Sequence, residues 1–334
     1  MRPPNYWNNP ACAPGWQARL LAPLAAIYAA ATARRLSKKP DITARVPVIC
    51  IGNLNIGGTG KTPATIALSL RLQGHGLTVH IVSRGYGGAL SGPVQVDEVR
   101  HSARDTGDEP LLLAAFTPTW VARDRAAGVR AAQTAGAEVI LLDDGFQNPS
   151  VQKDLSIIVV DARRGFGNGR VIPAGPLREP VAVGLGRCDI LLSIGGAGDQ
   201  DVFDANWSDH ITLPHCRGQL VPLETGMDWA DVKVLAFAGI GHPDKFFDTL
   251  RRLGAKVVRT KALDDHQPLS DVMLKRLEHE AATLNAQLVT TEKDAARLPK
   301  AYRAKVLTLP VRLQLTDWSE IDRRLAALGL ISAG

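Results

Sequence analysis

Short apolar runs alternate with longer helical patterns through much of the chain. The runs predicted to be strands are Val46–Ile51, Thr78–Val82, Trp120–Ala122, Val139–Leu142, Ile157–Val160 and Asp189–Ser193. The predicted helices between them include Pro63–Gln73, Glu109–Phe116 and Asp124–Ala135. Short β-rich runs with intervening helices indicate a parallel sheet that is covered on both faces. The pattern therefore predicts an α/β fold.

A second, smaller α/β series follows residue 225. Its expected strands are Val234–Ala238, Lys256–Arg259, Gln287–Thr290 and Lys305–Leu309, and its expected helices are Pro243–Leu253 and Ser270–Leu284. Between the two series, Asp199–Trp229 lacks clear periodicity, so we expect a link or a small irregular hairpin there. These patterns divide the chain into an N-terminal helical segment (1–40), a core (41–225) and a smaller α/β domain (226–334).

The net charge of +6 is concentrated at the N-terminus. Residues 1–50 hold seven cations and one anion, and the rest of the 334-residue chain holds 32 of each sign. A neutral body gives poor support for a nucleic-acid-binding surface, so we expect no nucleic-acid partner, whereas the basic N-terminus is suited to an anionic one. The four cysteines form no C-x-x-C pair, which is typical of a reduced protein without a disulfide framework or a zinc site.

The N-terminal segment contains an uncharged apolar stretch, Leu20–Ala33, followed by a basic cluster of Arg34, Arg35, Lys38 and Lys39. The stretch is shorter than the roughly 20 residues that span a bilayer. A signal-peptide core is one interpretation, but the cations that follow the stretch oppose translocation. A plain core helix is another. An amphipathic interfacial helix fits best, with Trp7 and Trp16 at the headgroup level, the cations on anionic lipid and Pro23 kinking the helix or beginning its regular part.

A glycine-rich stretch follows the first core strand and precedes a helix. It runs Asn55-Ile56-Gly57-Gly58-Thr59-Gly60-Lys61-Thr62. In this context backbone N–H groups and a helix N-terminus face nucleotide phosphates, Lys61 reaches the β- and γ-phosphates, and the Thr62 hydroxyl ligates Mg²⁺. The usual pattern has glycine at position 55, and Asn55 is one of the residues that tolerate left-handed geometry. The alternative is an ordinary glycine-rich turn.

The strand Val139–Leu142 ends in Asp143-Asp144, which is the arrangement that holds Mg²⁺ near the phosphates in P-loop proteins. A helix cap or a turn would use the same residues. Asp108 stands at the start of a predicted helix, so it is either an N-cap or a general base that accepts a proton from a substrate hydroxyl. His266 lies in a charged loop, where a histidine is usually solvated, although it could support such a base.

Two glycine-rich segments carry arginines suited to anions. Asp161–Pro180 contains Arg163, Arg164, Arg170 and Arg178, and a second loop contains Arg84. The planar guanidinium matches phosphate oxygens, so these loops are candidates for the substrate side of a cleft, or else they are solvated loops.

Several motifs occur in one order along nearly the whole chain. They are Gly57–Pro63, Ser83–Gly87, Gly107–Pro110, Asp143–Gln147, Pro173–Pro180, Phe237–Ile240, Asp265-His266 and Thr290–Asp294. In this order they resemble the tetraacyldisaccharide 4′-kinases, the lipid A kinases of Gram-negative bacteria. The Asp-Asp-Gly-Phe-Gln and Leu-Arg-Glu-Pro strings are the most specific. One departure is Asn148, where the family usually has histidine.

The resemblance implies a P-loop kinase core with a smaller α/β domain, and ATP and Mg²⁺ as cofactors. The substrate would be an acylated glucosamine disaccharide 1-phosphate, phosphorylated on its 4′-hydroxyl at the cytoplasmic face of the inner membrane. By motif position, Asp108, His266 and Lys61 match catalytic residues. The acids Asp143, Asp144 and Glu179 match positions near magnesium, and Arg178 matches a substrate-side position. Two rivals remain: a membrane-associated P-loop ATPase switch that binds a protein, and a soluble kinase of a small metabolite.

Overall fold

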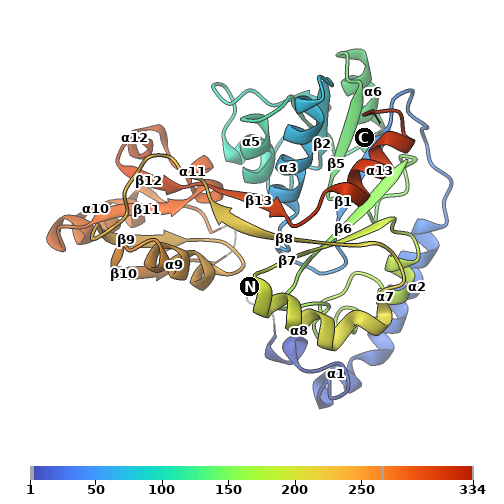
Figure 1. Cartoon of the computed structure of the whole chain (residues 1–334), viewed down its shortest axis with the longest axis horizontal. Helices are drawn as coiled ribbons and strands as arrows, with labels where there is room; N and C mark the ends of the chain where they lie inside the picture. Colours follow the sequence, from blue (N-terminus) through green and yellow to red (C-terminus); the bar gives the residue numbers. More distant parts are fainter. Residues whose placement is uncertain (1–3, 265–266, 333–334) are drawn as a thin grey trace.

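The computed structural model describes residues 4–264 and 267–332, and within them the strands form two separate sheets (Figure 1). The larger sheet has the order β13-β8-β7-β6-β1-β5-β2-β4-β3. Its strands are β1 (Val48–Gly52), β2 (Val79–Ser83), β3 (Val94–Gln95), β4 (Thr119–Val121), β5 (Val139–Asp143), β6 (Leu155–Asp161), β7 (Ile190–Ile194), β8 (His215–Pro222) and β13 (Val311–Leu315). Its neighbouring strands pair in parallel except at the two edges, where β3 and β13 run antiparallel to their neighbours.

The central strands are buried on both faces, as their unbroken apolar sequence predicts. On β1, Val48 and Cys50 face one core, whereas Ile49 and Ile51 face the other. The first face is covered by α6 (Arg125–Thr134), α7 (Val181–Leu185), α8 (Ala197–Trp207) and the N-terminal helices, and the second by α3 (Lys61–Gly74), α5 (Asp108–Ala114) and α13 (Ser319–Ala327). β1 lies between β5 and β6, so the segments that follow these three strands meet at one edge of the sheet.

The smaller sheet is fully parallel, with the order β10-β9-β11-β12. Its strands are β9 (Lys233–Ala238), β10 (Lys256–Ala262), β11 (Gln287–Thr291) and β12 (Val306–Leu309), and its helices are α9 (Pro243–Arg252), α10 (Asp271–Thr283), α11 (Glu292–Ala296) and α12 (Lys300–Arg303). α10 packs on one face and α9 on the other. This unit therefore has its own two-sided core.

The chain returns to the larger sheet after β12. β13 pairs with β8 from Val311↔Pro222 to Leu315↔Gly218, and α13 buries Ile321 and Leu325 against the core that contains α3. The sequence pattern placed residues 226–334 in the smaller domain. We propose instead that the smaller unit ends near residue 310, because the residues beyond it are packed on the larger sheet.

Most of the expected elements are present, with ends that differ from the expected ones by at most three residues. The exception is Asp199–Trp229, where a link or hairpin was expected. This region forms most of α8, the short 3₁₀ turn Ser208–His210 and β8, an inner strand of the larger sheet. The strand was missed because its alternation is short: after buried Cys216 and Gly218 and exposed Arg217 and Gln219, the apolar Leu220 is also exposed. Its second neighbour, β13, is remote in sequence.

The N-terminal segment forms a 3₁₀ turn (Asn5–Asn8), α1 (Trp16–Leu20) and α2 (Ala22–Leu36). Pro23 lies in the first turn of α2, so it begins the regular helix rather than kinking it. None of the helices in the described ranges is both long enough and apolar enough to cross a membrane. Short helices α4 (Ala103–Thr106) and α5 complete the larger unit.

Candidate nucleotide and phosphoryl-transfer site

The glycine-rich loop connects β1 to α3 and is held from inside by two asparagines. Asn53 is fully buried, and its Nδ2 donates to the Gly57 carbonyl at 3.1 Å and to Thr59 Oγ1 at 3.2 Å. Gly57 and Gly60 have φ values of 100° and 97°, which explains glycine at these positions. A Cβ on Gly60 would lie 2.7 Å from Ile194 Cδ1, whereas the space around Gly57 and Gly58 is open. The open side is where phosphates would approach the backbone N–H groups.

Asn55 occupies its position for a different reason than expected. Among the described residues, the non-glycine positions with positive φ are Asp144, Asp231 and Asn285, so Asn55 does not use left-handed geometry. Its Nδ2 instead donates to the Gly165 carbonyl at 3.1 Å. The Asn55 side chain therefore ties the phosphate loop to the arginine-rich loop that follows β6.

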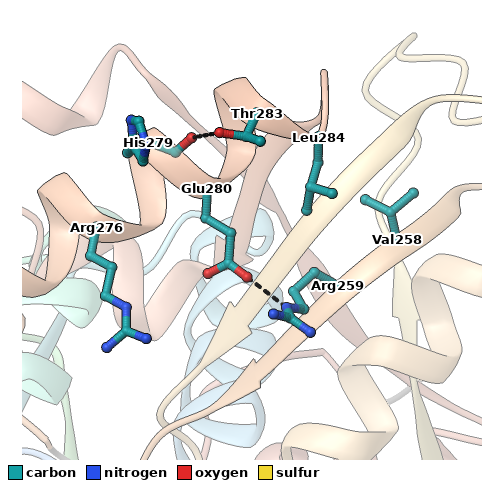
Figure 2. Close-up of a pocket in the computed structure, with 7 residues that line it drawn as sticks. All are labelled: Val258, Arg259, Arg276, His279, Glu280, Thr283 and Leu284. Carbon is teal, nitrogen blue, oxygen red and sulfur yellow. Dashed lines mark hydrogen bonds and ion pairs between the residues drawn. The ribbon is translucent and has the colours of Figure 1, made fainter.

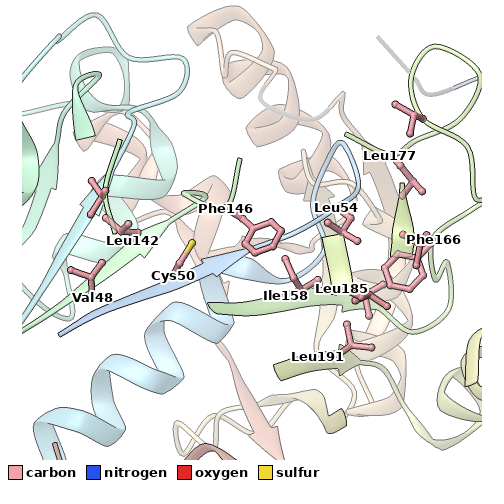
Figure 3. Packing of buried hydrophobic residues seen from close by; sticks show 14 of the residues in the cluster. Val48, Cys50, Leu54, Leu142, Phe146, Ile158, Phe166, Leu177, Leu185 and Leu191 are labelled. Atoms are coloured by element: carbon pink, nitrogen blue, oxygen red, sulfur yellow. The ribbon is translucent and has the colours of Figure 1, made fainter. Parts of the chain in front are cut away.

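The Leu-Arg-Glu-Pro segment pairs with the phosphate loop. Ile56 N donates to the Pro176 carbonyl at 2.8 Å, and Arg178 N donates to the Leu54 carbonyl at 2.7 Å. Leu54 and Leu177 are both fully buried in the core that also contains Phe146 of the acidic motif (Figure 3). Gly52 is required at the end of β1, because a Cβ there would lie 2.4 Å from Phe146 Cβ. Three motifs that are distant in sequence are thus anchored in one core.

Asp144 contacts two of the predicted site cations, Lys61 and Arg178. Arg178 Nη1 donates to Asp144 Oδ1 at 2.9 Å and Nη2 donates to Oδ2 at 3.2 Å, while Lys61 Nζ lies 3.7 Å from Oδ1. Burial alone would raise the pKa of Asp144, but the charges of Lys61 and Arg178 and the hydrogen bond from Arg178 lower the pKa below its usual value. Asp144 is therefore a charged carboxylate that holds Lys61 and Arg178 beside the phosphate loop.

Asp143 has different surroundings from its neighbour. It is 2% exposed, Ser83 Oγ donates to its Oδ2 at 3.0 Å, and its Oδ1 is buried without a hydrogen-bond partner among the described residues. Burial, together with the negative charges of Glu109 and Asp144, raises the pKa of Asp143 to about 7. An orphaned carboxylate oxygen of this kind, beside a phosphate loop, fits a divalent cation.

Few side chains of the site are available as magnesium ligands. The described residues contain no group of three His, Cys, Asp or Glu side chains arranged to hold a metal ion. Mg²⁺ in nucleotide sites usually takes one or two carboxylates together with phosphate oxygens and waters. Asp143 would supply one such carboxylate, and the hydroxyl of Thr62, the second residue of α3, is the further ligand expected at this position of a phosphate loop.

Glu179 is 1% exposed and both of its oxygens have protein partners. Gln147 Nε2 donates to Oε1 at 3.0 Å, and Arg187 Nη2 donates to Oε2 at 2.6 Å. The Arg187 guanidinium also lies over the Phe146 ring, 4.3 Å from its centroid. The magnesium role expected for Glu179 stays a prediction, and this geometry gives it no support because the charge is already neutralised by Arg187.

Asp108 is the first residue of α5 and is 5% exposed. The N-cap of this helix is Gly107, so the Asp108 side chain is not the cap that one interpretation of the sequence expected. The carboxylate faces the smaller unit, with Oδ2 3.9 Å from Arg297 Nε, and the next residue, Glu109, pairs with Lys293 at 3.3 Å. Because the charge of Glu109 acts on Asp143, the start of α5 also adjoins the acid pair.

The remaining predicted residues are placed as follows. His266 lies outside the described residues. Arg84 is exposed in the loop after β2. The arginine-rich loop is partly packed, with Asn168 buried and Pro173 accepting hydrogen bonds from Tyr6 Oη and Trp7 Nε1. Trp7 therefore contacts this loop, and its expected place at the headgroup level stays a prediction.

Some members of the site could not be recognised from the sequence. Arg125 is 3% exposed behind the acid pair, and its Nη2 donates to the Asp143 carbonyl at 3.3 Å. Arg187 and Arg297 likewise contact predicted acids. Each stands in an ordinary helical or loop sequence, so no local signal marks them. The Asn148 departure has a local explanation, since its Oδ1 accepts from Ser150 N at 2.8 Å and holds the turn after the acidic motif.

A surface cavity of about 460 Å³ lies far from this site in the fold. It is on the smaller unit between β10 and α10, and the Arg259–Glu280 ion pair crosses it (Figure 2). None of the predicted site residues lines it.

The glycine-rich loop lies between a strand and a helix that begins with Lys61 and Thr62, and the neighbouring strand ends in two acids. This arrangement defines a P-loop nucleotide-binding protein of the kinase type. A family model described as tetraacyldisaccharide-1-P 4′-kinase matches residues 17–329. The chain belongs to this family, which confirms the resemblance seen in the sequence.

Individual relatives agree. The chain is 61% identical over 329 residues to a tetraacyldisaccharide 4′-kinase of Dinoroseobacter shibae, with 98% of each chain covered. It is 51% identical over 335 residues to one of Rhodospirillum centenum, with 98% of this chain and 97% of the relative covered. A crystal structure of LpxK from Aquifex aeolicus in complex with ATP superposes with a TM-score of 0.75 at 26% identity, covering 93% of this chain and 99% of that one. The chain is thus a kinase of this family, and the P-loop kinase fold and the expected cofactors ATP and Mg²⁺ agree with these relatives.

Proposed function

We propose that this protein transfers the γ-phosphoryl group of ATP to the 4′-hydroxyl of a tetraacyl glucosamine disaccharide 1-phosphate, giving the 1,4′-bisphosphate and ADP. The observation that carries the proposal is the meeting of three groups at one edge of the larger sheet. These groups are the phosphate loop with Lys61, the acids Asp143 and Asp144 with Arg178, and the start of α5, where Glu109, the neighbour of Asp108, acts on Asp143 through its charge. The family membership gives the lipid disaccharide as the substrate class.

In the transfer step the acceptor oxygen forms a bond to the γ-phosphorus, and the bond between that phosphorus and the β–γ bridging oxygen breaks. We assign Asp108 to accept the proton of the acceptor hydroxyl, which increases the charge on the attacking oxygen. Lys61 and Arg178 supply positive charge where the phosphoryl oxygens and the ADP leaving group carry negative charge. Positioning and charge neutralisation therefore account for the chemistry.

Magnesium, when bound with ATP, neutralises charge on the phosphates. Asp143 Oδ1 and the Thr62 hydroxyl are the groups we assign to hold it, because Asp143 Oδ1 is buried without another partner. Asp144 has a different role, since its oxygens orient Lys61 and Arg178. Arg84, exposed after β2, is assigned to the substrate side.

The N-terminal helices support a membrane-surface role. α1 and α2 bury the small residues Ala18, Ala25 and Thr32 and pack the half-buried Leu21 and Tyr28 against the core, but they leave other large apolar residues outside: Trp16 (69% exposed), Leu20 (69%), Leu24 (54%) and Ile27 (67%). An ordinary surface helix has polar residues on its outer face. The exposed Arg34, Arg35, Lys38 and Lys39 follow at the end of α2. We assign this face to the acyl boundary of an anionic membrane.

The acyl chains of the substrate would be anchored in the same membrane, so we place the enzyme peripherally at the cytoplasmic face of the inner membrane. The near-neutral body gives no support for nucleic-acid binding. The family membership disfavours an ATPase switch, and the outward apolar face of α1 and α2 disfavours a soluble small-metabolite kinase.

The test is transfer of ³²P from [γ-³²P]ATP to tetraacyldisaccharide 1-phosphate in detergent micelles, with Lys61→Ala as the matched blank. We expect label in the lipid with the native chain and none with the blank. Steady ATP hydrolysis without label in the lipid would overturn the proposal in favour of the ATPase switch.

A further inference from the structure

The junction between the two units contains a buried arginine that faces Asp108. Arg297 follows α11 as its C-cap residue, and its side chain is 8% exposed. Asp108 reaches it from α5 of the larger unit, which packs on α11. A buried guanidinium is retained only where its charge and its N–H groups are matched by partners.

The smaller unit fixes the orientation of this guanidinium. Its Nη2 contacts the Asp294 carboxylate and lies 3.4 Å from the Gly239 carbonyl, and its Nη1 donates to the Gln267 carbonyl at 3.0 Å. Asp294 is itself fully buried and accepts from Gly239 N at 3.0 Å and from Thr291 Oγ1 at 2.7 Å. The arginine is therefore held by fixed backbone groups and a fixed carboxylate.

The remaining edge of the guanidinium is directed out of the smaller unit. Arg297 Nε is buried and has no hydrogen-bond partner among the described residues, and it lies 3.9 Å from Asp108 Oδ2. Both side chains are nearly excluded from solvent, so their charges interact with little screening. Asp294, Arg297 and Asp108 thus form a chain of alternating charges across the junction.

We propose that Arg297 is a positioning residue for phosphoryl transfer, which orients the Asp108 carboxylate and stabilises its charged form across the junction. The inference rests on the proposed role of Asp108 as the base. Arg297 does not touch the substrate in this role; it acts through Asp108. Gln267, which follows His266 in sequence, is bound to the same guanidinium, so Arg297 links two segments that the sequence marks as functional.

A second ion pair between the two units serves as the comparison. Lys245 of α9 has its Nζ 3.1 Å from Asp161 Oδ2 at the end of β6. The two side chains are 37% and 13% exposed, so water screens this pair more strongly. If docking of the two units were the whole function of such contacts, Lys245 and Arg297 would be equivalent.

The experiment compares Arg297→Gln, Arg297→Lys and the control Lys245→Gln by steady-state kinetics, with thermal unfolding of each variant. Displacement of a reacting group by about 1 Å can lower a rate roughly 100-fold, so we expect kcat of Arg297→Gln to fall about 10- to 100-fold. The KM values for ATP and lipid should change little, because no ground-state contact is lost. Arg297→Lys retains the charge and should recover part of kcat, and Lys245→Gln should stay near the native kcat. A native kcat in Arg297→Gln, or equal losses in Arg297→Gln and Lys245→Gln, would overturn the proposal.

A double-mutant cycle separates this inference from the base role itself. If Arg297 acts through Asp108, Arg297→Gln should cause no further loss of kcat in an Asp108→Asn background. Additive losses would overturn the positioning role while leaving Asp108 as the base. A native kcat in Asp108→Asn alone would overturn the base role, which is a different result. If Arg297→Gln does not fold, Arg297→Lys enters the same cycle, with coupling supporting the proposal and additivity contradicting it.

Discussion

Arg178 holds Asp144 through both terminal nitrogens of its guanidinium, with Nη1 at 2.9 Å from Oδ1 and Nη2 at 3.2 Å from Oδ2. A two-point contact of this kind fixes the plane of the guanidinium as well as its position. Arg178 also donates its backbone N–H to the phosphate loop. The arginine assigned to the substrate side is thus oriented by the acid that follows β5 before any substrate is bound.

Arg178→Lys should lower kcat/KM for the lipid substrate by about tenfold or more, because an ammonium is a single point donor and cannot hold both Asp144 oxygens. Steady-state kinetics with the lipid varied at saturating ATP measures this. Arg217→Lys is the matched control, since Arg217 contacts Asp204 through one nitrogen, which lysine can replace. Equal losses of kcat/KM in the two variants would contradict a specific function of the two-point contact made by the Arg178 guanidinium.

Asp108→Asn should lower kcat by about 10²- to 10⁴-fold, the usual contribution of a general base. The KM for ATP should change little, because the carboxylate acts at the chemical step. Lys61→Ala should lose nearly all turnover. Glu98→Gln, which changes an exposed acid in the loop before α4, is the control. An unchanged kcat in Asp108→Asn would remove the base role.

Replacing Leu20 and Ile27 together by glutamine should weaken binding to anionic liposomes roughly 100-fold. Each large apolar side chain contributes at least about 1.5 kcal/mol when buried, and about 3 kcal/mol corresponds to that factor. Thermal stability should not change, because both side chains are exposed in the fold. Sedimentation with liposomes is the measurement.

The matched control for this surface is Val99→Gln with Val272→Gln, two apolar residues that are exposed elsewhere. Equal binding by the Leu20/Ile27 variant and the native chain would contradict the membrane assignment. Point changes are preferable to removal of residues 1–40, because Ala18 and Ala25 belong to the core and Tyr6 bonds the Pro173 carbonyl.

His242 should make the protein acid-sensitive. Burial lowers its pKa to about 4, helped by the positive charge of Arg164. The unfolded chain therefore takes up the proton first, and stability that is present above pH 6.5 should be lost as the pH falls from 6.5 toward 4. His242→Gln should flatten the dependence of the unfolding midpoint on pH in this window. His75→Gln, at the exposed end of α3, should not.

The parts of the site that could be predicted are those in which chemistry and local structure are neighbours in sequence. The Gly57–Lys61 loop could be recognised as a phosphate site because the strand before it and the helix after it are its neighbours in sequence. The acids Asp143 and Asp144 could be recognised because they directly follow the apolar residues of β5. The Asp143 and Asp144 roles could not be separated in this way, since the difference between them comes from Arg178, Lys61 and Ser83, which lie on other segments.

The contacts of Asp108 and the course of residues 311–332 could not be predicted from the sequence for the same reason. Nothing near Arg297 indicates that it faces an aspartate of the other unit. β13 follows β12 with one residue between them, so the pattern suggests one continuous domain. Only the pairing of β13 with β8 shows that the chain has crossed back.

That crossing determines how the smaller unit is attached. The chain leaves the larger sheet along β8 and returns along β13, and the two strands are hydrogen-bonded side by side up to Pro222 and Val311 (Figure 1). A two-stranded ribbon bends out of its plane more readily than it shears within it, because shearing breaks the ladder between the strands. The smaller unit is therefore attached through two strands that are hydrogen-bonded to each other, and this connection restricts the directions in which Arg297 could move relative to Asp108.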